Sequence, residues 1–167
     1  DTDVTVDLDA GTAAGSSTGE DTLTDIENVI TGGGDDVIVA NDEVNELSGG
    51  SGNDIFVFRS SHATGRGAGY RDKILDFEVG DRIDLDDISD EFEDAVEDHF
   101  EDQDIKKFVL IGQQDEFSRP GQIRLKYDEI DGKAVTVIQG NIDYDRDVEF
   151  ELELRGTYTL RSEQFET

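Results

Sequence analysis

Cysteine, methionine and tryptophan are absent from the chain, and proline occurs only once. Without cysteine there can be no disulfide framework and no thiolate metal site. The two histidines, His62 and His99, lie outside any HExxH pattern, which excludes the zinc-binding helix of a metalloprotease. No apolar run approaches the roughly 18 residues that a membrane-spanning helix needs. We therefore expect no insertion into a membrane.

Positive charge is scarce as well. The chain carries 14 Lys and Arg residues against 43 Asp and Glu residues, a formal net charge of −29. Such a charge repels nucleic acids and anionic lipids, so neither is expected as a partner, and it attracts cations. An acidic surface also keeps proteins soluble in very salty environments. Composition therefore leaves two explanations of the charge open, bound metal and a salty habitat.

The 167 residues suffice for one domain of ordinary size or two small ones. Hydrophobic residues make up only 34%, but nine Phe and four Tyr provide material for a core. Because the chain opens on Asp1 and not on Met, we expect it to be part of a longer protein.

A nine-residue repeat occupies the segment 31–57, in the units TGGGDDVIV, ANDEVNELS and GGSGNDIFV. In every unit the eighth residue is large and apolar, and the sixth is Asp or Asn. The eighth residues are Ile38, Leu47 and Phe56, and the sixth are Asp36, Asn45 and Asp54. The same spacing places Val29 and Glu27 before the repeat, and Ile74 and Asp72 after it.

A unit of six turn residues and three strand residues makes half a coil of a parallel β-solenoid. Two units would complete a coil of 18 residues, so Asp36, Asp54 and Asp72 are expected to stack along one edge. Glu27 and Asn45 are then expected along the other edge. Glycines allow the tight turns, and stacked carbonyl and carboxylate oxygens form the hard ligand cage that Ca²⁺ prefers.

The third unit fits the GGxGxDxUx nonapeptide of RTX (hemolysin-type) proteins, a calcium-binding repeat, and the first fits with Thr31 at its opening position. The second unit is degenerate. The segment YRDKILDFEVGDRIDLDDIS (70–89) resembles the capping segment in the C-terminal modules of serralysin-type metalloproteases and of mannuronan C5-epimerases. The segment 59–77 resembles the epimerase R-modules slightly more, and 121–156 resembles the closing sheet of the same modules.

The resemblance implies an all-β fold, in which a short parallel β-roll with Ca²⁺ in its turns is capped by an antiparallel sheet and one short acidic helix. The roll with its lead-in strand would cover residues 1–80 and the cap residues 81–167, as one continuous module. The metal-binding residues implied by repeat and resemblance together are Gly32, Gly34, Asp35, Asp36, Asn45, Gly50, Gly52, Asn53, Asp54 and Asp72.

The segment 141–149 departs from the resemblance, because relatives often carry a glycine-broken acidic stretch of the type DxDGDG there. Tyr144 and Arg146 occupy the glycine places in this chain, and an acidic carboxylate set remains around them. That set is Asp143, Asp145, Asp147 and Glu149. An acidic hairpin turn is the favoured interpretation, and a second metal site is the alternative.

The remaining segments show simple patterns. Residues 4–8 alternate as a strand does, and strand patterns dominate after residue 106, with Asp131-Gly132 as a hairpin turn between two of them. Residues 84–104 are acidic with an apolar stripe of helical spacing, and Ser89 or Asp90 is the expected N-cap. The stripe consists of Ile88, Phe92, Val96 and Phe100. Its acidic face is expected to be solvated, with a calcium store as the alternative.

No catalytic residue is predicted, since no GxSxG elbow is present and both resembled families keep their catalytic residues in an upstream domain.

We expect a non-enzymatic, monomeric, secreted or cell-surface module that folds on Ca²⁺ after type I export from a bacterium. The first alternative is a module that binds an anionic polysaccharide such as alginate, and the second is a structural segment of an adhesin. The basic residues available for a polysaccharide near the roll are Arg59, Arg66, Arg71 and Lys73.

Overall fold

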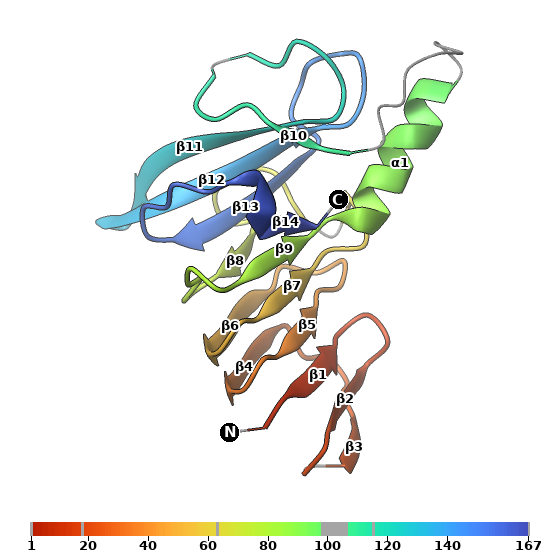
Figure 1. Ribbon diagram of the computed structural model, residues 1–167, viewed down its shortest axis with the longest axis vertical. Helices are drawn as coiled ribbons and strands as arrows, with labels where there is room; N and C mark the ends of the chain where they lie inside the picture. Colours follow the sequence, from red (N-terminus) through yellow and green to blue (C-terminus); the bar gives the residue numbers. More distant parts are fainter. Residues whose placement is uncertain (1, 18, 63, 98–106, 115, 167) are drawn as a thin grey trace.

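Strands of two sheets dominate the regular secondary structure of the computed structural model, which describes residues 2–17, 19–62, 64–97, 107–114 and 116–166 (Figure 1). No helix in these described ranges is long and apolar enough to cross a membrane. The predicted all-β class is confirmed, with one α-helix of several turns beside the sheets.

Each sheet has seven strands. The first sheet contains, in spatial order, β14 (Phe165–Glu166), β9 (Arg82–Asp84), β7 (Ile55–Val57), β5 (Val37–Val39), β1 (Val4–Asp7), β2 (Thr12–Gly15) and β3 (Gly19–Thr22). The second contains β10 (Val109–Leu110), β11 (Gln122–Ile130), β12 (Lys133–Asn141), β13 (Phe150–Arg155), β8 (Asp72–Ile74), β6 (Glu46–Ser51) and β4 (Asn28–Gly33).

Between β4 and β9 the chain alternates between the two sheets and so forms successive coils (Figure 1). Strands β4, β6 and β8 are parallel neighbours in one sheet, and β5, β7 and β9 are parallel neighbours in the other. Leu47 pairs with Val29, 18 residues earlier, but with Ile74, 27 residues later. The third coil is therefore longer by one nine-residue unit, which lies in the connection 58–71 between β7 and β8.

The space between the sheets is filled by the eighth residue of each repeat unit. Ile38, Leu47 and Phe56 are completely buried, and Ile74 and Ile83 continue the same row at exposed fractions of 1% and 0%. Residues on either side of them in the strands point away from this core, as the two-residue period of a strand requires. The sequence periodicity thus identifies the inward positions correctly.

The N-terminal segment adds a hairpin to the first coil. Strand β1 pairs in parallel with β5 and antiparallel with β2, and β2 pairs antiparallel with β3. Val6 and Leu8 are buried against the core, as the alternating pattern of residues 4–8 predicts.

Strands β11, β12 and β13 form an antiparallel meander. Asp131 and Gly132 join β11 to β12 with φ angles of 52° and 74°, which confirms the predicted two-residue hairpin turn. Strand β13 then pairs in parallel with β8, so the meander extends the sheet of the coils. The meander thus caps the open edge of the coils, and it does so by continuing their hydrogen-bonded sheet.

The helix α1 (Asp86–Glu97) follows β9. The predicted N-cap at Ser89 or Asp90 is wrong, because the helix already begins at Asp86, whose N–H donates to the Asp84 carboxylate at 3.0 Å. Ser89 N–H donates to the Leu85 carbonyl and lies inside the first turn. Of the predicted apolar stripe, Ile88 is completely buried. The side chains of Phe92 and Val96, and all of Phe100, lie outside what the structure describes, as does His99.

Residues 142–149 connect β12 to β13 as a turn rich in carboxylates. Arg146, which stands at one of the expected glycine places, adopts a φ angle of 70°. Arg146 therefore takes the left-handed conformation in which a glycine was expected. This conformation is less favourable for arginine, because its Cβ atom crowds the backbone.

Candidate metal sites

A ladder of aspartates runs along the edge formed by the turns 34–36, 52–54 and 75–81, which we call the aspartate edge. The Val4 N–H donates to Asp36 Oδ1 at 2.9 Å, and the Asp36 N–H donates to Asp54 Oδ1 at 2.9 Å. The Asp54 N–H in turn donates to Asp81 Oδ1 at 3.0 Å. Each carboxylate thus joins its own coil to the preceding one.

The second carboxylate oxygens of Asp36 and Asp54 are the notable feature of this edge. Both residues are buried, at exposed fractions of 0% and 1%. Within the described part of the chain, neither Oδ2 atom has a hydrogen-bond donor. A buried carboxylate oxygen without a partner is costly, and a bound hard cation would supply that partner. The residues of the aspartate edge therefore fit Ca²⁺ by the chemistry of their donors.

Carbonyl oxygens approach the same edge closely. A Cβ atom on Gly50 would lie 1.9 Å from the Gly32 carbonyl oxygen, and a Cβ on Gly52 would lie 1.9 Å from the Gly34 oxygen. Both Gly50 and Gly52 also have left-handed φ angles, 93° and 146°. The glycines of the repeat therefore allow the carbonyl groups of one turn to lie directly against the next turn.

A second, more exposed ladder runs one residue earlier in each turn. Asp35 N–H donates to Asp3 Oδ1 at 3.0 Å, and Asn53 N–H donates to Asp35 Oδ1 at 2.8 Å. The Asn53 side chain extends to the third coil, where its Oδ1 would contact a Cβ on Gly80 at 2.2 Å. The structure therefore brings the predicted metal residues of the first and third repeat units together.

Two acidic residues of this edge escaped the sequence analysis. Asp81 follows Asp54 by 27 residues and occupies the same ladder position. Asp76 accepts hydrogen bonds from Ser48 Oγ at 2.5 Å and from Gly50 N–H at 2.9 Å. Burial, together with the charges of Asp54 and Asp76, raises the pKa of Asp81 to about 6. A comparison of positions 27 residues apart, which is three repeat units instead of two, identifies Asp81 as the counterpart of Asp54.

The opposite edge, made by the connections 40–45 and 58–71, is called here the asparagine edge. The Asn45 N–H donates to Asp72 Oδ1 at 2.8 Å, so Asp72 stacks on Asn45. The prediction that Asp72 stacks with Asp36 and Asp54 is wrong. The inserted nine residues keep Asp72 in phase with the repeat but shift it by half a coil, to the other edge.

Asp72 is nearly isolated from solvent. Its exposed fraction is 1%, and its Oδ2 has no hydrogen-bond donor in the described ranges. Burial raises the pKa of Asp72 to about 7, against a smaller lowering by the Asn45 N–H. Asn45 in turn accepts a hydrogen bond from the Asn41 N–H at 3.0 Å. The asparagine edge thus holds one buried carboxylate where the aspartate edge holds a ladder of them.

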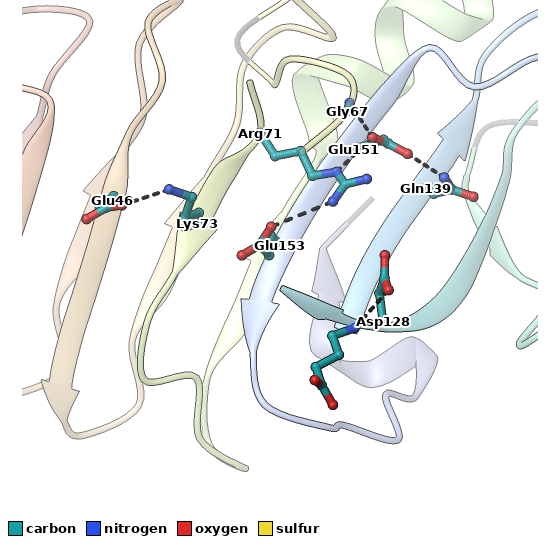
Figure 2. A network of polar contacts seen from close by, with 9 residues as sticks. Glu46, Gly67, Arg71, Lys73, Asp128, Gln139, Glu151 and Glu153 are labelled. Atoms are coloured by element: carbon teal, nitrogen blue, oxygen red, sulfur yellow. Dashed lines mark hydrogen bonds and ion pairs between the residues drawn. The ribbon is translucent and has the colours of Figure 1, made fainter. Parts of the chain in front are cut away.

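The four predicted ligand-binding cations do not form a single cluster. Arg59 lies 3.1 Å from Asp7 Oδ2 across the first sheet. Lys73 lies 2.8 Å from Glu46 Oε1 on the neighbouring strand of the second sheet (Figure 2). The other two, Arg66 and Arg71, both contact the segment 148–153. Each of the four charges is therefore already close to a carboxylate or carbonyl group.

A network of polar contacts fastens the connection 58–71 to β13 (Figure 2). Arg71 Nε donates to Glu151 Oε2 at 2.8 Å, and Glu153 Oε2 lies 3.6 Å from Arg71 Nη1. Gly67 N–H and the Gln139 side chain also donate to Glu151. Burial acts to raise the pKa of Glu151, but the hydrogen bonds from Arg71, Gly67 and Gln139 hold it below its usual value. The inserted residues are thereby held in place by the meander.

Comparison with known proteins identifies one matching family model. The family model described as "Peptidase M10 serralysin C terminal" matches residues 9–164. A comparison with curated proteins finds no match.

Among solved structures, the chain is similar to the solution structures of two subunits of a mannuronan C5-epimerase from Azotobacter vinelandii. The TM-scores are 0.51 and 0.53, at 21% and 22% sequence identity. Each match covers 83% of this chain, and they cover 66% and 74% of the two subunits. At such identity the similarity concerns the fold.

The stacking of the turns predicts a position-specific effect of adding one methyl group. Gly50→Ala should lower the unfolding free energy by about 2–5 kcal/mol, the sum of a left-handed alanine and of overpacking against the Gly32 carbonyl. Gly69→Ala is the matched control, because Gly69 has the same φ angle of 93° with nothing near its Cβ position. It should cost only about 1–2 kcal/mol. Equal losses in urea unfolding would show that the turns are not in close contact.

The buried Asp72 predicts an unusual pH dependence when metal is chelated. The folded chain keeps the Asp72 proton up to pH about 7, while the unfolded chain releases it near pH 4. The folded state then binds more protons, so its stability falls as pH rises from 4 to 7, by at most about 1.4 kcal/mol per pH unit.

Asp72→Asn removes this titration. In urea unfolding with EDTA, the unfolding free energy of Asp72→Asn should fall less than that of the wild type as pH rises. At pH 8 the variant should be the more stable of the two. Asp42→Asn changes the same charge at an exposed position and is the control. Parallel stability curves for wild type and Asp72→Asn would contradict the prediction.

Proposed function

The chain belongs to the serralysin C-terminal family of the M10 peptidases, and on that premise we propose that it is a non-catalytic, calcium-binding RTX module. Its coils are a short parallel β-roll, and Ca²⁺ binds in the turns. The module folds on Ca²⁺ outside the cell after type I export, and acts as a monomeric accessory part of a secreted bacterial protein. The roll, whose last coil strand is β9 (Arg82–Asp84) and which therefore extends a few residues beyond the expected boundary at residue 80, forms one continuous unit with its cap.

One observation carries this proposal, the buried Oδ2 atoms of Asp36 and Asp54 without a donor in the described chain. They lie on successive coils, beside turns in which the carbonyl groups of one coil lie close against the glycines of the next. The proposed ligands of the aspartate edge are Gly32, Gly34, Asp35, Asp36, Gly50, Gly52, Asn53 and Asp54, with Asp76 and Asp81 added from the structure. Asn45 and Asp72 are the proposed ligands of the asparagine edge.

Electrostatics explains why such a module would depend on its ions. Burial raises the pKa of Asp54, and the charges of Asp36, Asp76 and Asp35 raise it further, so the stacked carboxylates repel one another when ionised. The whole chain adds a net charge of −29. Each Ca²⁺ site filled at 100 times its Kd stabilises the fold by about 2.7 kcal/mol. Two or three such sites are comparable with the total stability of a domain.

The same dependence would couple folding to location. Extracellular calcium modules bind with Kd values of roughly 10⁻⁴ to 10⁻³ M. Such sites stay empty at the low Ca²⁺ concentration of a cytosol and fill outside the cell. The chain would therefore remain unfolded and exportable before secretion, and it would fold afterwards.

Binding of an anionic polysaccharide such as alginate is the second candidate, supported by the similarity in fold to the epimerase subunits. The charge distribution speaks against direct binding. Arg59 and Lys73 are paired with carboxylates, Arg71 is buried against Glu151, and Arg66 donates to the Val148 carbonyl. A polyuronate would thus need Ca²⁺ as a bridge to this surface.

The calcium proposal predicts a specific rise in thermal stability. At fixed ionic strength, Ca²⁺ at 100 times its Kd should raise the Tm by about 5–10 °C for each site filled, as followed by circular dichroism. Asp36→Asn with Asp54→Asn should lose most of this rise. Asp42→Asn with Glu43→Gln removes the same charge from exposed positions and should keep it. If NaCl of matched ionic strength gives the same rise as CaCl₂, the acidity is an adaptation to salt and the sites are wrong.

The polysaccharide candidate is tested separately by co-sedimentation with alginate. We expect no binding in EDTA, because both partners are anionic, and Ca²⁺-dependent binding only if the ion bridges them. Binding in EDTA that Arg66→Gln or Arg59→Gln abolishes would show a direct basic site and contradict this expectation. Calcium-dependent folding without co-sedimentation at any Ca²⁺ concentration would remove the polysaccharide candidate and leave the calcium module in place.

A further inference from the structure

The acidic turn between β12 and β13 gathers three carboxylates at one point. One oxygen each of Asp143, Asp145 and Glu149 lies within 4.8 Å of the other two. Two oxygens that bind the same Ca²⁺ at about 2.4 Å can be at most about 4.8 Å apart. The three side chains are therefore already spaced as ligands of a single ion.

Backbone N–H groups of the turn orient these carboxylates. Asp145 N–H donates to Asp143 Oδ1 at 2.9 Å, and Asp147 N–H donates to Asp145 Oδ1 at 2.8 Å. Ile142 N–H donates to Glu149 Oε2 at 2.8 Å, which closes the turn from its other end. The convergence is thus built into the turn and does not depend on flexible side chains meeting by chance.

Asn141 is the independent observation that points to a ligand. The residue is completely buried, and its Nδ2 donates to the Asp147 carbonyl at 3.1 Å, so its amide group extends into the turn. Its Oδ1 is buried without a hydrogen-bond donor in the described residues. A buried amide oxygen normally has a donor or a metal ion as its partner. Carboxylate and amide oxygens together are the ligand types that Ca²⁺ prefers.

The electrostatic state of Glu149 agrees with this geometry. Burial and, to a smaller extent, the charges of Asp143 and Asp145 raise its pKa to about 7, against a lowering by the Ile142 N–H and by Arg66. A divalent cation at the point of convergence would remove that repulsion. Glu149 also lines a cavity of about 340 Å³ next to Arg66, so water can complete the six to eight oxygens that Ca²⁺ requires.

We propose that the turn 141–149 binds one Ca²⁺ through Asn141 Oδ1 and the carboxylates of Asp143, Asp145 and Glu149. This site is separate from the turns of the roll, and it uses residues outside the nonapeptide repeats. It lies where Arg66 of the connection 58–71 donates to the Val148 carbonyl at 2.7 Å. The ion would therefore stabilise the part of the meander against which the inserted residues pack.

Terbium luminescence tests the proposal directly, since Tb³⁺ occupies calcium sites and is excited by nearby tyrosines. The chain has no tryptophan, and Tyr144 stands between two of the proposed ligands. Tyr158, whose pKa is raised by burial and by the charges of Asp76, Asp81 and Glu78, lies near the roll turns and would report on them. The two sites thus have different sensitisers.

We expect Tyr144→Phe to lower the Tb³⁺ emission while the number of bound Ca²⁺ ions, measured by calorimetry, stays the same. Asp145→Asn with Glu149→Gln should bind one Ca²⁺ fewer than the wild type. Asp128→Asn with Glu129→Gln makes the same charge change at exposed positions of β11 and should bind the full number. Circular dichroism in the far ultraviolet verifies that each variant keeps its strands.

Two outcomes would overturn the proposal. One is a full Ca²⁺ count in the Asp145→Asn, Glu149→Gln variant, and the other is unchanged Tb³⁺ emission in Tyr144→Phe, which keeps all four ligand side chains. The second result decides even if the double variant fails to fold. A loss of Tyr144-dependent emission supports the site whether or not the roll binds Ca²⁺, because the roll has its own sensitiser in Tyr158.

Discussion

The hydrogen bond from a backbone N–H to the aspartate of the next coil is the interaction on which the rest of the structure depends. It links Val4 to Asp36, Asp36 to Asp54, and Asp54 to Asp81. It also draws the carboxylates out of water and places them one coil apart, close to 5 Å. Their remaining charge must then be neutralised by a proton or a cation. Folding of this chain therefore requires that the charge of these buried carboxylates be compensated, and the proposed Ca²⁺ ions would compensate it.

The thin core and the C-terminal cap follow from the same arrangement. Each strand of a coil contributes only one large side chain, such as Leu47 from β6 and Phe56 from β7, to the space between the sheets. A core this narrow cannot be closed by the coils alone, because the last coil would leave open strand edges. Strand β13 covers the edge of β8 and β14 covers that of β9. The network around Arg71 and Glu151 then holds the longer third coil against this cap.

Local patterns accounted for much of the fold. The nonapeptide predicted the inward residues Ile38, Leu47 and Phe56, and Asp131-Gly132 predicted the hairpin, because each depends on residues close in sequence. The start of α1 was not predicted correctly. The Asp84 carboxylate, at the end of strand β9, accepts the Asp86 N–H and starts the helix before Ser89. Asp81 was missed because its partner in space, Asp54, lies 27 residues away.

The sequence by itself determined the period of the repeat, the residue types of its turns and the acidic character of the surface. It could not determine on which edge Asp72 lies, because an insertion of one unit preserves the nine-residue phase and exchanges the two sheets. Pairing between strands decides that question. Nor could it show that Arg59, Arg71 and Lys73 are paired with carboxylates, or that Asn141 meets the acidic turn. Those contacts join residues that only the closed sheets bring together.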